Sequence, residues 1–288
     1  MTNAADASES KQLIRIGHSP DPDDAFMFYG LASGQVNAGR YRVEHQLVDI
    51  QTLNERATRG ELEISAISVA AYPHLADRYA MLACGSSMGD GYGPLVVARK
   101  PMTLADLTAP GARIAVPGCM TTAYLTLQLC LGPNFAHEVV PFDQIIDRVA
   151  TGQVDAGLII HEGQLTFAQR GLVKVIDLGV WWAEQTGLPL PLGGNVIRRD
   201  LGDQACRELA DLLRQSIRFG LAHRAEAVAH ALKFARDMGA DLADRFVGMY
   251  VNDWTIDYGP RGRAAVNELL SRGHAAGLLP RIEPVTFV

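Results

Sequence analysis

Short runs of apolar residues, many of them β-branched, alternate along the chain with longer segments in which apolar and polar positions follow a helical period. The clearest run covers residues 156–160, and its unbroken apolar character predicts a central strand that is covered on both faces. Further strands are predicted at residues 13–17, 41–47, 63–68, 95–98, 112–116, 138–141, 173–178 and 195–198. Strands that alternate with helices indicate an α/β protein with mostly parallel sheets.

Capping residues and glycines delimit the predicted helices. Asp23 or Asp24 caps a helix that runs through residues 28–33, and Ser68 caps a helix over residues 69–77, in which Pro73 marks an irregularity. The remaining helices are predicted at residues 52–57, 103–107, 123–131, 142–151, 164–170, 203–239, from there to about 251, and 261–272.

The order of these elements predicts two lobes. The chain changes unit near Arg99, and residues 195–198 form a strand that returns to the first unit. The first lobe would then comprise residues 12–99 and 196–288, and the second lobe residues 100–195. Two crossovers between the lobes would leave a cleft between them.

Length, charge and cysteine content narrow the class of protein. A chain of 288 residues is long enough for roughly two domains. Its net charge of −6 argues against a nucleic-acid partner, but a local pocket can still bind a small anion. Neither the polar N-terminal segment nor any apolar run predicts a secretory signal or a membrane span. Four cysteines without paired spacing indicate reduced thiols, so the sequence predicts a cytoplasmic protein.

His161 is the candidate catalytic residue. It follows the strand over residues 156–160 directly, and ligands of open α/β sheets bind beyond the carboxyl ends of the strands. A neutral imidazole can accept a proton near pH 7, because the unperturbed pKa of histidine is about 6.5. A single structural hydrogen bond explains a histidine at this position equally well. Its neighbour Glu162 points to the opposite side if the chain stays extended.

Three other junctions between a strand and a helix carry polar residues. Thr121 and Thr122 follow a Pro-Gly turn at a predicted helix N-terminus, where backbone N–H groups and hydroxyls can hold a carboxylate or a phosphate. Plain N-capping explains these threonines equally well. Residues 65–68 and 18–24 form two similar junctions, although turn formation and capping would account for the aspartates of the latter. Four such junctions, counting that of His161, indicate one shared cleft.

Several motifs are absent from the sequence. It contains no GxGxxG after a strand, no Walker A loop, no GxSxG elbow and no zinc-ligand spacing. We therefore predict neither a cofactor nor a metal ion.

At these junctions the sequence resembles the family of 1,4-dihydroxy-6-naphthoate synthases, which act in the futalosine route to menaquinone. The segment Leu-Ile-Ile-His-Glu at residues 158–162 is its most specific feature. The resemblance extends over residues 19–20, 24, 26–29, 52–54, 68, 70–72, 93–99, 116–118, 121–124, 156–162 and 187–193.

The resemblance implies a two-lobed α/β fold of the periplasmic-binding-protein type (type II), with a central cleft and two crossovers. It implies a lyase that acts on a small anionic cyclic substrate, cyclic dehypoxanthinyl futalosine, and releases 1,4-dihydroxy-6-naphthoate. His161 would be the general base of a retro-aldol-like elimination that aromatises the ring and expels the sugar portion. The resemblance implies that Ala66, Ile67, Ser68, Thr122 and Ala123 contact the substrate. The junctions add Ser19, Asp24 and Thr121, which completes the set of expected substrate-binding residues.

Three positions depart from the pattern of this family. Its first loop often contains cysteine and asparagine where this chain has Asp21 and Asp23, and a lysine often stands where this chain has Ala66. A positive charge that would meet the substrate carboxylate is therefore missing, and His18 or Arg99 would have to replace it. Two alternatives share the fold: a non-catalytic solute-binding protein, and the sibling enzyme chorismate dehydratase.

Overall fold

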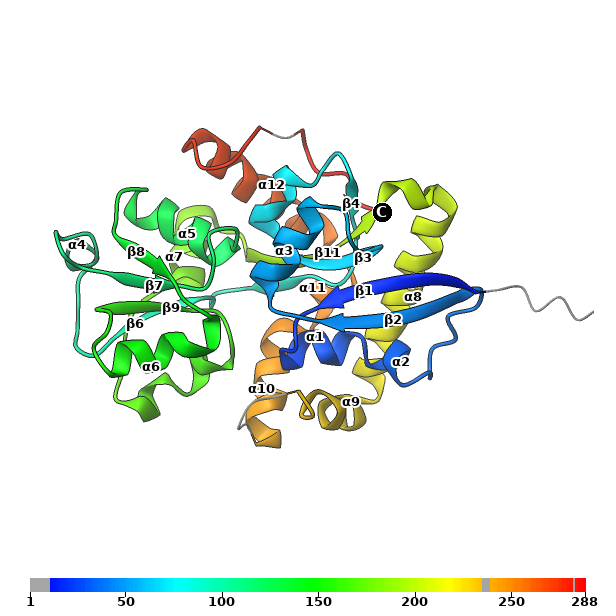
Figure 1. The fold of residues 1–288 in the computed structure, drawn as a ribbon, viewed down its shortest axis with the longest axis horizontal. Coiled ribbons are helices and arrows are strands. Elements are labelled where there is room, and N and C mark those ends of the chain that lie inside the picture. The colour runs from blue at the N-terminus through cyan, green and yellow to red at the C-terminus, as the bar shows by residue number, and fades with distance from the viewer. Residues whose placement is uncertain (1–10, 235–238, 282) are drawn as a thin grey trace, which may run out of the picture.

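The computed structural model describes residues 11–234, 239–281 and 283–288, which form two lobes side by side (Figure 1). Most of the polar N-terminal segment and residues 235–238 of the predicted helix over 203–239 lie outside the described residues. Within the described part, no helix is both long enough and apolar enough to cross a membrane.

The first lobe contains a sheet with the strand order β2-β1-β3-β11-β4, and β5 pairs with β11. The strands are β1 (Gln12–His18), β2 (Tyr41–Leu47), β3 (Ile64–Ser68), β4 (Tyr79–Met81), β5 (Ser87–Gly89) and β11 (Leu190–Arg198). Strand β1 runs parallel to β2 and β3, whereas β11 is antiparallel to β3, β4 and β5.

The second lobe contains a sheet with the strand order β10-β6-β9-β7-β8. Its strands are β6 (Leu95–Ala98), β7 (Ile114–Val116), β8 (His137–Val139), β9 (Ala156–Ile159) and β10 (Val173–Asp177). Strand β7 is parallel to β8 and β9, whereas β6 is antiparallel to β9 and β10.

The prediction of mostly parallel sheets is therefore wrong, because both sheets are mixed. The antiparallel strands β6 and β11 follow the two crossings of the chain between lobes. Each enters its sheet from the side of the other lobe, while β1, β3, β7 and β9 end on that side. Sheet pairing also places β6 in the second sheet and all of β11 in the first. The crossings thus precede Leu95 and Leu190, earlier than the predicted boundaries at residues 99 and 195.

Twelve α-helices surround the sheets in the described part of the chain. They are α1 (Pro22–Met27), α2 (Tyr29–Ala32), α3 (Ile50–Thr58), α4 (Leu104–Leu107), α5 (Thr122–Leu131), α6 (Ile145–Ala150), α7 (Leu178–Thr186), α8 (Asp203–Ala222), α9 (Arg224–Ala231), α10 (Ala240–Tyr250), α11 (Asp253–Ile256) and α12 (Gly259–Ala275). The predicted helix over residues 69–77 is a shorter 3-10 helix, η1 (Val69–His74), because Pro73 cannot donate a backbone hydrogen bond. Other 3-10 helices are η2 (Phe142–Gln144), η3 (Glu162–Leu165), η4 (Phe167–Arg170) and η5 (Arg199–Leu201).

The hydrophobic core of the first lobe lies on both faces of its sheet. On one face Ile14 and Ile16 of β1 pack with the apolar stripe of α8, where Leu209, Leu213 and Ile217 recur at helical spacing. Burial of each such side chain contributes about 1.5–3 kcal/mol. The opposite face is covered by α3, η1 and α12. The ends of the parallel strands are thereby held firmly beside the second lobe.

The two segments that cross between the lobes lie backbone against backbone. A Cβ atom on Gly93 would approach the Gly179 nitrogen to 2.8 Å and its Cα to 2.9 Å, so only glycine fits there. The Leu178 N–H donates to the Pro94 carbonyl at 2.9 Å. The loop before β6 and the start of α7 are therefore packed as one unit.

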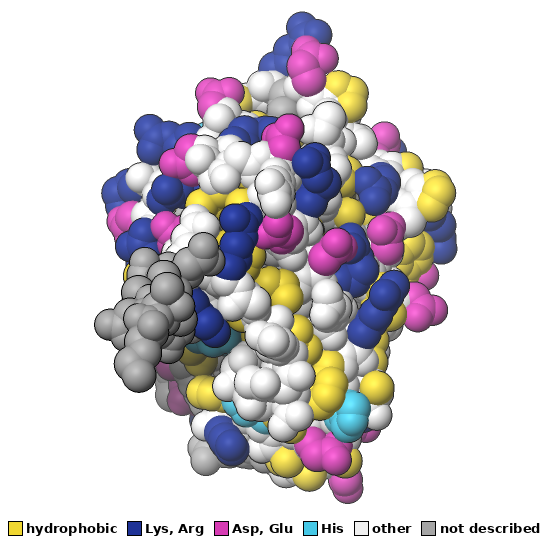
Figure 2. All heavy atoms as spheres, turned by 90° about the vertical axis from the view of Figure 1, so that its right-hand side faces the viewer, with side chains coloured by type: hydrophobic (Ala, Val, Ile, Leu, Met, Phe, Trp, Pro, Cys, Tyr) yellow, Lys and Arg dark blue, Asp and Glu magenta, His cyan; other side chains and the backbone are white. Residues whose placement is uncertain are grey.

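The far end of the first lobe carries mixed charge. Figure 2 shows acidic and basic side chains interspersed over this face. Ion pairs combine such charges in this lobe: Arg198, at the end of β11, contacts Glu63 at 3.3 Å and Asp200 at 2.8 Å. This face thus lacks the single-sign basic surface that favours nucleic acid.

Candidate active site

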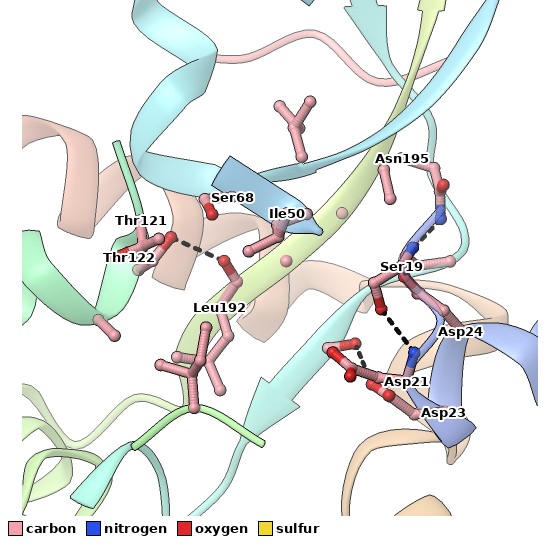
Figure 3. Close-up of a pocket in the computed structure, with 18 of the residues that line it drawn as sticks. Ser19, Asp21, Asp23, Asp24, Ile50, Ser68, Thr121, Thr122, Leu192 and Asn195 are labelled. Atoms are coloured by element: carbon pink, nitrogen blue, oxygen red, sulfur yellow. Dashed lines mark hydrogen bonds between the residues drawn. The ribbon is translucent and has the colours of Figure 1, made fainter. Parts of the chain in front are cut away.

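One cavity lies where the strand ends of both lobes meet, and we call it the interlobe cavity. All of the expected substrate-binding residues line it: Ser19, Asp24, Ala66, Ile67, Ser68, Thr121, Thr122 and Ala123. Figure 3 shows Ser19 with three aspartates on one side of this cavity and Ser68, Thr121 and Thr122 on the other. The structure therefore brings together three of the four predicted junctions, and their role in binding stays a prediction.

The wall that holds Ser68 is built around a buried asparagine. Asn54 of α3 accepts a hydrogen bond from the Ser68 N–H at 2.8 Å and donates one to the Ser68 hydroxyl at 3.1 Å. Because Asn54 is fully buried, its amide cannot exchange these partners for water. The carboxyl end of β3 is thus fixed in one position against the cavity.

The two threonines at the start of α5 have different roles. Thr121 caps the helix, since its hydroxyl accepts from the Tyr124 N–H at 3.2 Å. The Thr122 hydroxyl accepts from the Ala70 N–H at 3.1 Å and donates to the Leu192 carbonyl at 2.7 Å. It therefore links the second lobe to two segments of the first. The first N–H groups of a helix have no intrahelical acceptor, so the main chain at Thr122 and Ala123 has donors that an anion could use.

The opposite wall is acidic, because Asp21 and Asp23 join the expected Asp24 there. Asp24 accepts from the Ser19 N–H at 2.8 Å, and Asp23 accepts from the Ser87 hydroxyl at 3.4 Å. Asp21 stands at the N-cap of α1, yet its side chain makes no capping hydrogen bond. Asp21 and Asp23 line the cavity with Asp24, so the interpretation of these residues as turn and capping residues alone was incomplete.

Burial raises the pKa of each of these carboxyl groups, and repulsion by nearby carboxylates adds to the shift at Asp21 and Asp23. Burial, followed by repulsion from Glu162, raises the pKa of Asp21 to about 7. Burial raises the pKa of Asp24 to about 6, against the effect of its hydrogen bonds with Ser19. Burial and both neighbouring aspartates raise the pKa of Asp23 well above its usual value. The acidic wall therefore carries fewer negative charges near pH 7 than its three carboxyl groups suggest.

The proposed replacements for a missing positive charge do not face the cavity. His18 Nδ1 lies 2.9 Å from the Ser19 carbonyl and must donate to it, so its Nε2 accepts from His45 Nδ1 at 3.2 Å. Burial lowers the pKa of both histidines to about 4, which leaves them neutral near pH 7. Arg99 lines a separate hollow with Asp155. His18 instead positions the main chain at Ser19.

His161 lies beside the interlobe cavity rather than in its wall. Ile160 lines the cavity, whereas His161 and Glu162 line an adjacent hollow. The imidazole Nδ1 accepts from the Gly163 N–H at 3.0 Å, so the proton is on Nε2, which donates to the Phe142 carbonyl at 3.1 Å. Glu162 comes within 3.6 Å of Nδ1. Both ring nitrogens are thus bonded to the main chain, because His161 also caps η3.

The lining of the interlobe cavity has two chemically different sides. N–H and hydroxyl groups gather at the α5 side, and carboxyl groups gather at the α1 side. Among the described residues that line it, none is lysine, arginine or histidine. The described part of the chain also contains no group of three or more His, Cys, Asp or Glu side chains placed to hold one metal ion. The arrangement suits a compound with an anionic end and an uncharged, hydroxylated end.

Strand β11 also contributes residues that the sequence did not predict as site residues. Leu192, Gly193, Gly194 and Asn195 line the floor of the cavity between its two sides. Asn195 donates to the Gly85 carbonyl at 2.8 Å and so joins β11 to the loop after β4. The glycine pair in an otherwise regular strand was the available signal, since such glycines often mark a close approach of a ligand.

Known proteins resemble the chain over nearly its full length. The family described as "Menaquinone biosynthesis" matches residues 14–275. A Thermus thermophilus protein named 1,4-dihydroxy-6-naphtoate synthase is 43% identical over 267 residues, which cover 93% of this chain and 96% of the relative.

Solved structures show the same architecture. A crystal structure of a protein from Archaeoglobus fulgidus matches with a TM-score of 0.88 and 46% identity, covering 93% of this chain and 98% of that one. A Candida albicans protein described as having the generic periplasmic-binding-protein fold matches with a TM-score of 0.68 at 15% identity, covering 95% and 92% of the two chains. The latter similarity shows the fold alone, and it confirms the predicted fold type. The chain itself belongs to the menaquinone-biosynthesis family of enzymes that includes the Thermus thermophilus synthase.

Proposed function

We propose that this protein converts cyclic dehypoxanthinyl futalosine to 1,4-dihydroxy-6-naphthoate, as a lyase of menaquinone biosynthesis in the cytoplasm. The observation that carries the proposal is the interlobe cavity, into which all eight expected substrate-binding residues converge. The name of the Thermus thermophilus relative supports the same reaction. The substrate would be a small anionic ring compound, and the reaction would need no nucleic acid, membrane or cofactor.

The substrate carboxylate would bind at the α5 side. The N–H groups of Thr122 and Ala123 lie at a helix N-terminus, where the helix dipole favours a negative charge. The Ser68 hydroxyl faces the same space from the other lobe. These donors would replace the lysine that is absent at Ala66.

His161 would act as the general base after a change in its hydrogen bonds. A base needs an unprotonated ring nitrogen with a free lone pair, and Nδ1 now accepts from Gly163. Rotation of the side chain away from Gly163 and toward Ile160 would free Nδ1 at the edge of the interlobe cavity. Substrate in the cavity would favour this rotation if it offers a better partner than the Gly163 N–H.

The proposal is tested by adding the cyclic substrate to the purified protein and following naphthoate absorbance. Loss of a general base costs about 10²–10⁴-fold in rate, so His161→Ala should bind substrate but release little product. His161→Asn is the matched variant, because asparagine also caps helices but cannot accept the proton. Turnover by either variant close to that of the wild type would exclude His161 as the base.

Two further incubations separate the alternatives. Turnover of chorismate in place of the cyclic compound would identify the protein as a chorismate dehydratase. Tight binding of the cyclic compound without any product would identify a binding protein.

A further inference from the structure

The two-sided lining of the interlobe cavity sets the direction in which an anionic substrate binds. Its carboxylate is attracted to the N-terminus of α5 and repelled by the carboxyl groups of Asp21, Asp23 and Asp24. The sugar-derived portion is uncharged and rich in hydroxyls, which can donate hydrogen bonds to carboxyl groups. The portion that leaves during the proposed reaction therefore faces the acidic wall.

The carboxyl groups of the three aspartates differ in the hydrogen bonds that they accept from the protein. Asp24 holds the Ser19 N–H at 2.8 Å, and Asp23 accepts from the Ser87 hydroxyl. Asp21 begins α1, where an aspartate normally accepts a hydrogen bond from the first turn of its helix, but it makes no such bond. Its backbone N–H is satisfied by the Ser19 hydroxyl at 3.1 Å. Asp21 thus lines the cavity with a carboxyl group that is not needed to cap the helix.

Asp21 also lies within electrostatic range of the proposed base. Electrostatic interactions with both His161 and Glu162 influence the pKa of its carboxyl group. Asp21 comes from the strand end of β1 in the first lobe, and His161 from the strand end of β9 in the second. Two groups able to carry a proton therefore approach the same region from opposite lobes.

We propose that Asp21 is a second catalytic residue of this cavity, the general acid that gives a proton to the departing portion of the substrate. This inference rests on the proposed function. His161 takes a proton from the substrate, the electron pair of that bond passes into the ring system, and the bond to the sugar-derived portion breaks. The departing atom keeps the electron pair of the broken bond and takes the proton of Asp21. Carboxylate and imidazolium then remain, and proton exchange with water restores both groups.

Its surroundings keep Asp21 partly protonated near neutral pH. Its pKa of about 7 results from burial and from repulsion by Glu162 and Asp24, against attraction by His161 and a hydrogen bond with Ser19. Tyr250 of α10, whose hydroxyl donates to Gln164 at 2.9 Å, is a further titratable group near this wall, and the charge of Asp23 contributes to its raised pKa. A general acid works only while it is protonated. The rate should therefore fall as the pH rises through the pKa of Asp21.

The test compares the kcat and KM of the wild type and Asp21→Asn, with the cyclic substrate, from pH 5.5 to 9. Asparagine preserves shape and N-capping ability but carries no transferable proton. We expect kcat to fall by about 10²–10⁴-fold, with KM within about threefold and with the alkaline decline of kcat lost. Asp21→Glu should recover part of the rate with a shifted alkaline limb. Asp241→Asn, at an exposed position of α10, is the control and should match the wild type.

The outcomes separate this proposal from the function on which it rests. If the wild type forms naphthoate and Asp21→Asn retains more than a third of its kcat with the same pH profile, Asp21 is not the acid, while the proposed function stands. If the wild type forms no product, the proposed function fails first and this proposal with it. Circular dichroism checks folding, and should Asp21→Asn not fold, an unshifted alkaline limb in Asp21→Glu would overturn the proposal.

Discussion

Replacing Gly93 with alanine tests whether the two crossing segments are packed as tightly as the structure shows. The added Cβ would meet the nitrogen and the Cα of Gly179 at 2.8 and 2.9 Å. Carbon atoms in favourable contact lie about 3.5–4.0 Å apart, so the segments must separate by roughly 0.5–1 Å. Both atoms belong to the backbone and cannot rotate away as a flexible side chain would.

Two costs add up in this variant. Overpacking of a well-packed site costs about 1–3 kcal/mol. The displaced N–H of Gly179 donates to the Asp177 carboxylate at 2.9 Å, and weakening such a helix cap costs about 1 kcal/mol. We therefore expect Gly93→Ala to lower the free energy of unfolding by about 2–4 kcal/mol.

Urea unfolding at pH 7 measures this change through the midpoint and the slope of the transition. Gly239→Ala is the control for steric overlap, because a Cβ there meets nothing within 4 Å; since Gly239 is the N-cap of α10, its replacement should still change the free energy of unfolding by no more than about 1 kcal/mol. A loss below about 0.5 kcal/mol in Gly93→Ala would refute the packing argument.

Three further predictions concern polar groups around the cavity. Asn54→Ala should lower the free energy of unfolding in urea titrations by about 2–3 kcal/mol, because it removes both hydrogen bonds to Ser68 and leaves the buried Ser68 N–H unpaired. A loss under about 1 kcal/mol would contradict this. Thr122→Val should weaken substrate binding measured by calorimetry about tenfold, since it breaks the link between the lobes, whereas Thr122→Ser should bind like the wild type. Burial lowers the pKa of His18 to about 4, so as the pH falls the unfolded chain binds a proton before the folded one does. Between pH 6.5 and 4, the free energy of unfolding of the wild type relative to His18→Asn should therefore drop by about 3 kcal/mol. A difference that stays constant over this range would exclude a buried neutral His18.

Local sequence patterns were sufficient to predict most strands and the place where they converge. The apolar run over residues 156–160 corresponds to β9 (Ala156–Ile159). Thr121 caps α5, as expected if this threonine is an N-capping residue. These features depend on neighbours along the chain, so a single sequence contains the information. The direction of β6 and β11 could not be predicted from neighbouring residues, because it depends on which lobe the chain has just left.

The roles of Asp21 and His161 could not be settled from their neighbours in the sequence. The pair Asp21-Pro22 is typical of a helix start, and it does start α1. That its carboxyl group enters the cavity depends on how the two lobes meet, which also brings it into electrostatic range of Glu162, about 140 positions further along the chain. His161 was expected in the cleft, but the following Gly163 lets the chain turn so that the imidazole caps η3.

Strand β11 has a consequence for the order in which the protein forms during synthesis. All strands of the second sheet lie between Leu95 and Asp177, so this sheet can be completed by a continuous stretch of chain. The first sheet must wait for β11, which begins at Leu190 and lies between β3 and β4. Until β11 leaves the ribosome, β3, β4 and β5 carry open edges that invite pairing with other chains. A truncation before Leu190 should therefore leave a folded second lobe attached to an aggregation-prone first half.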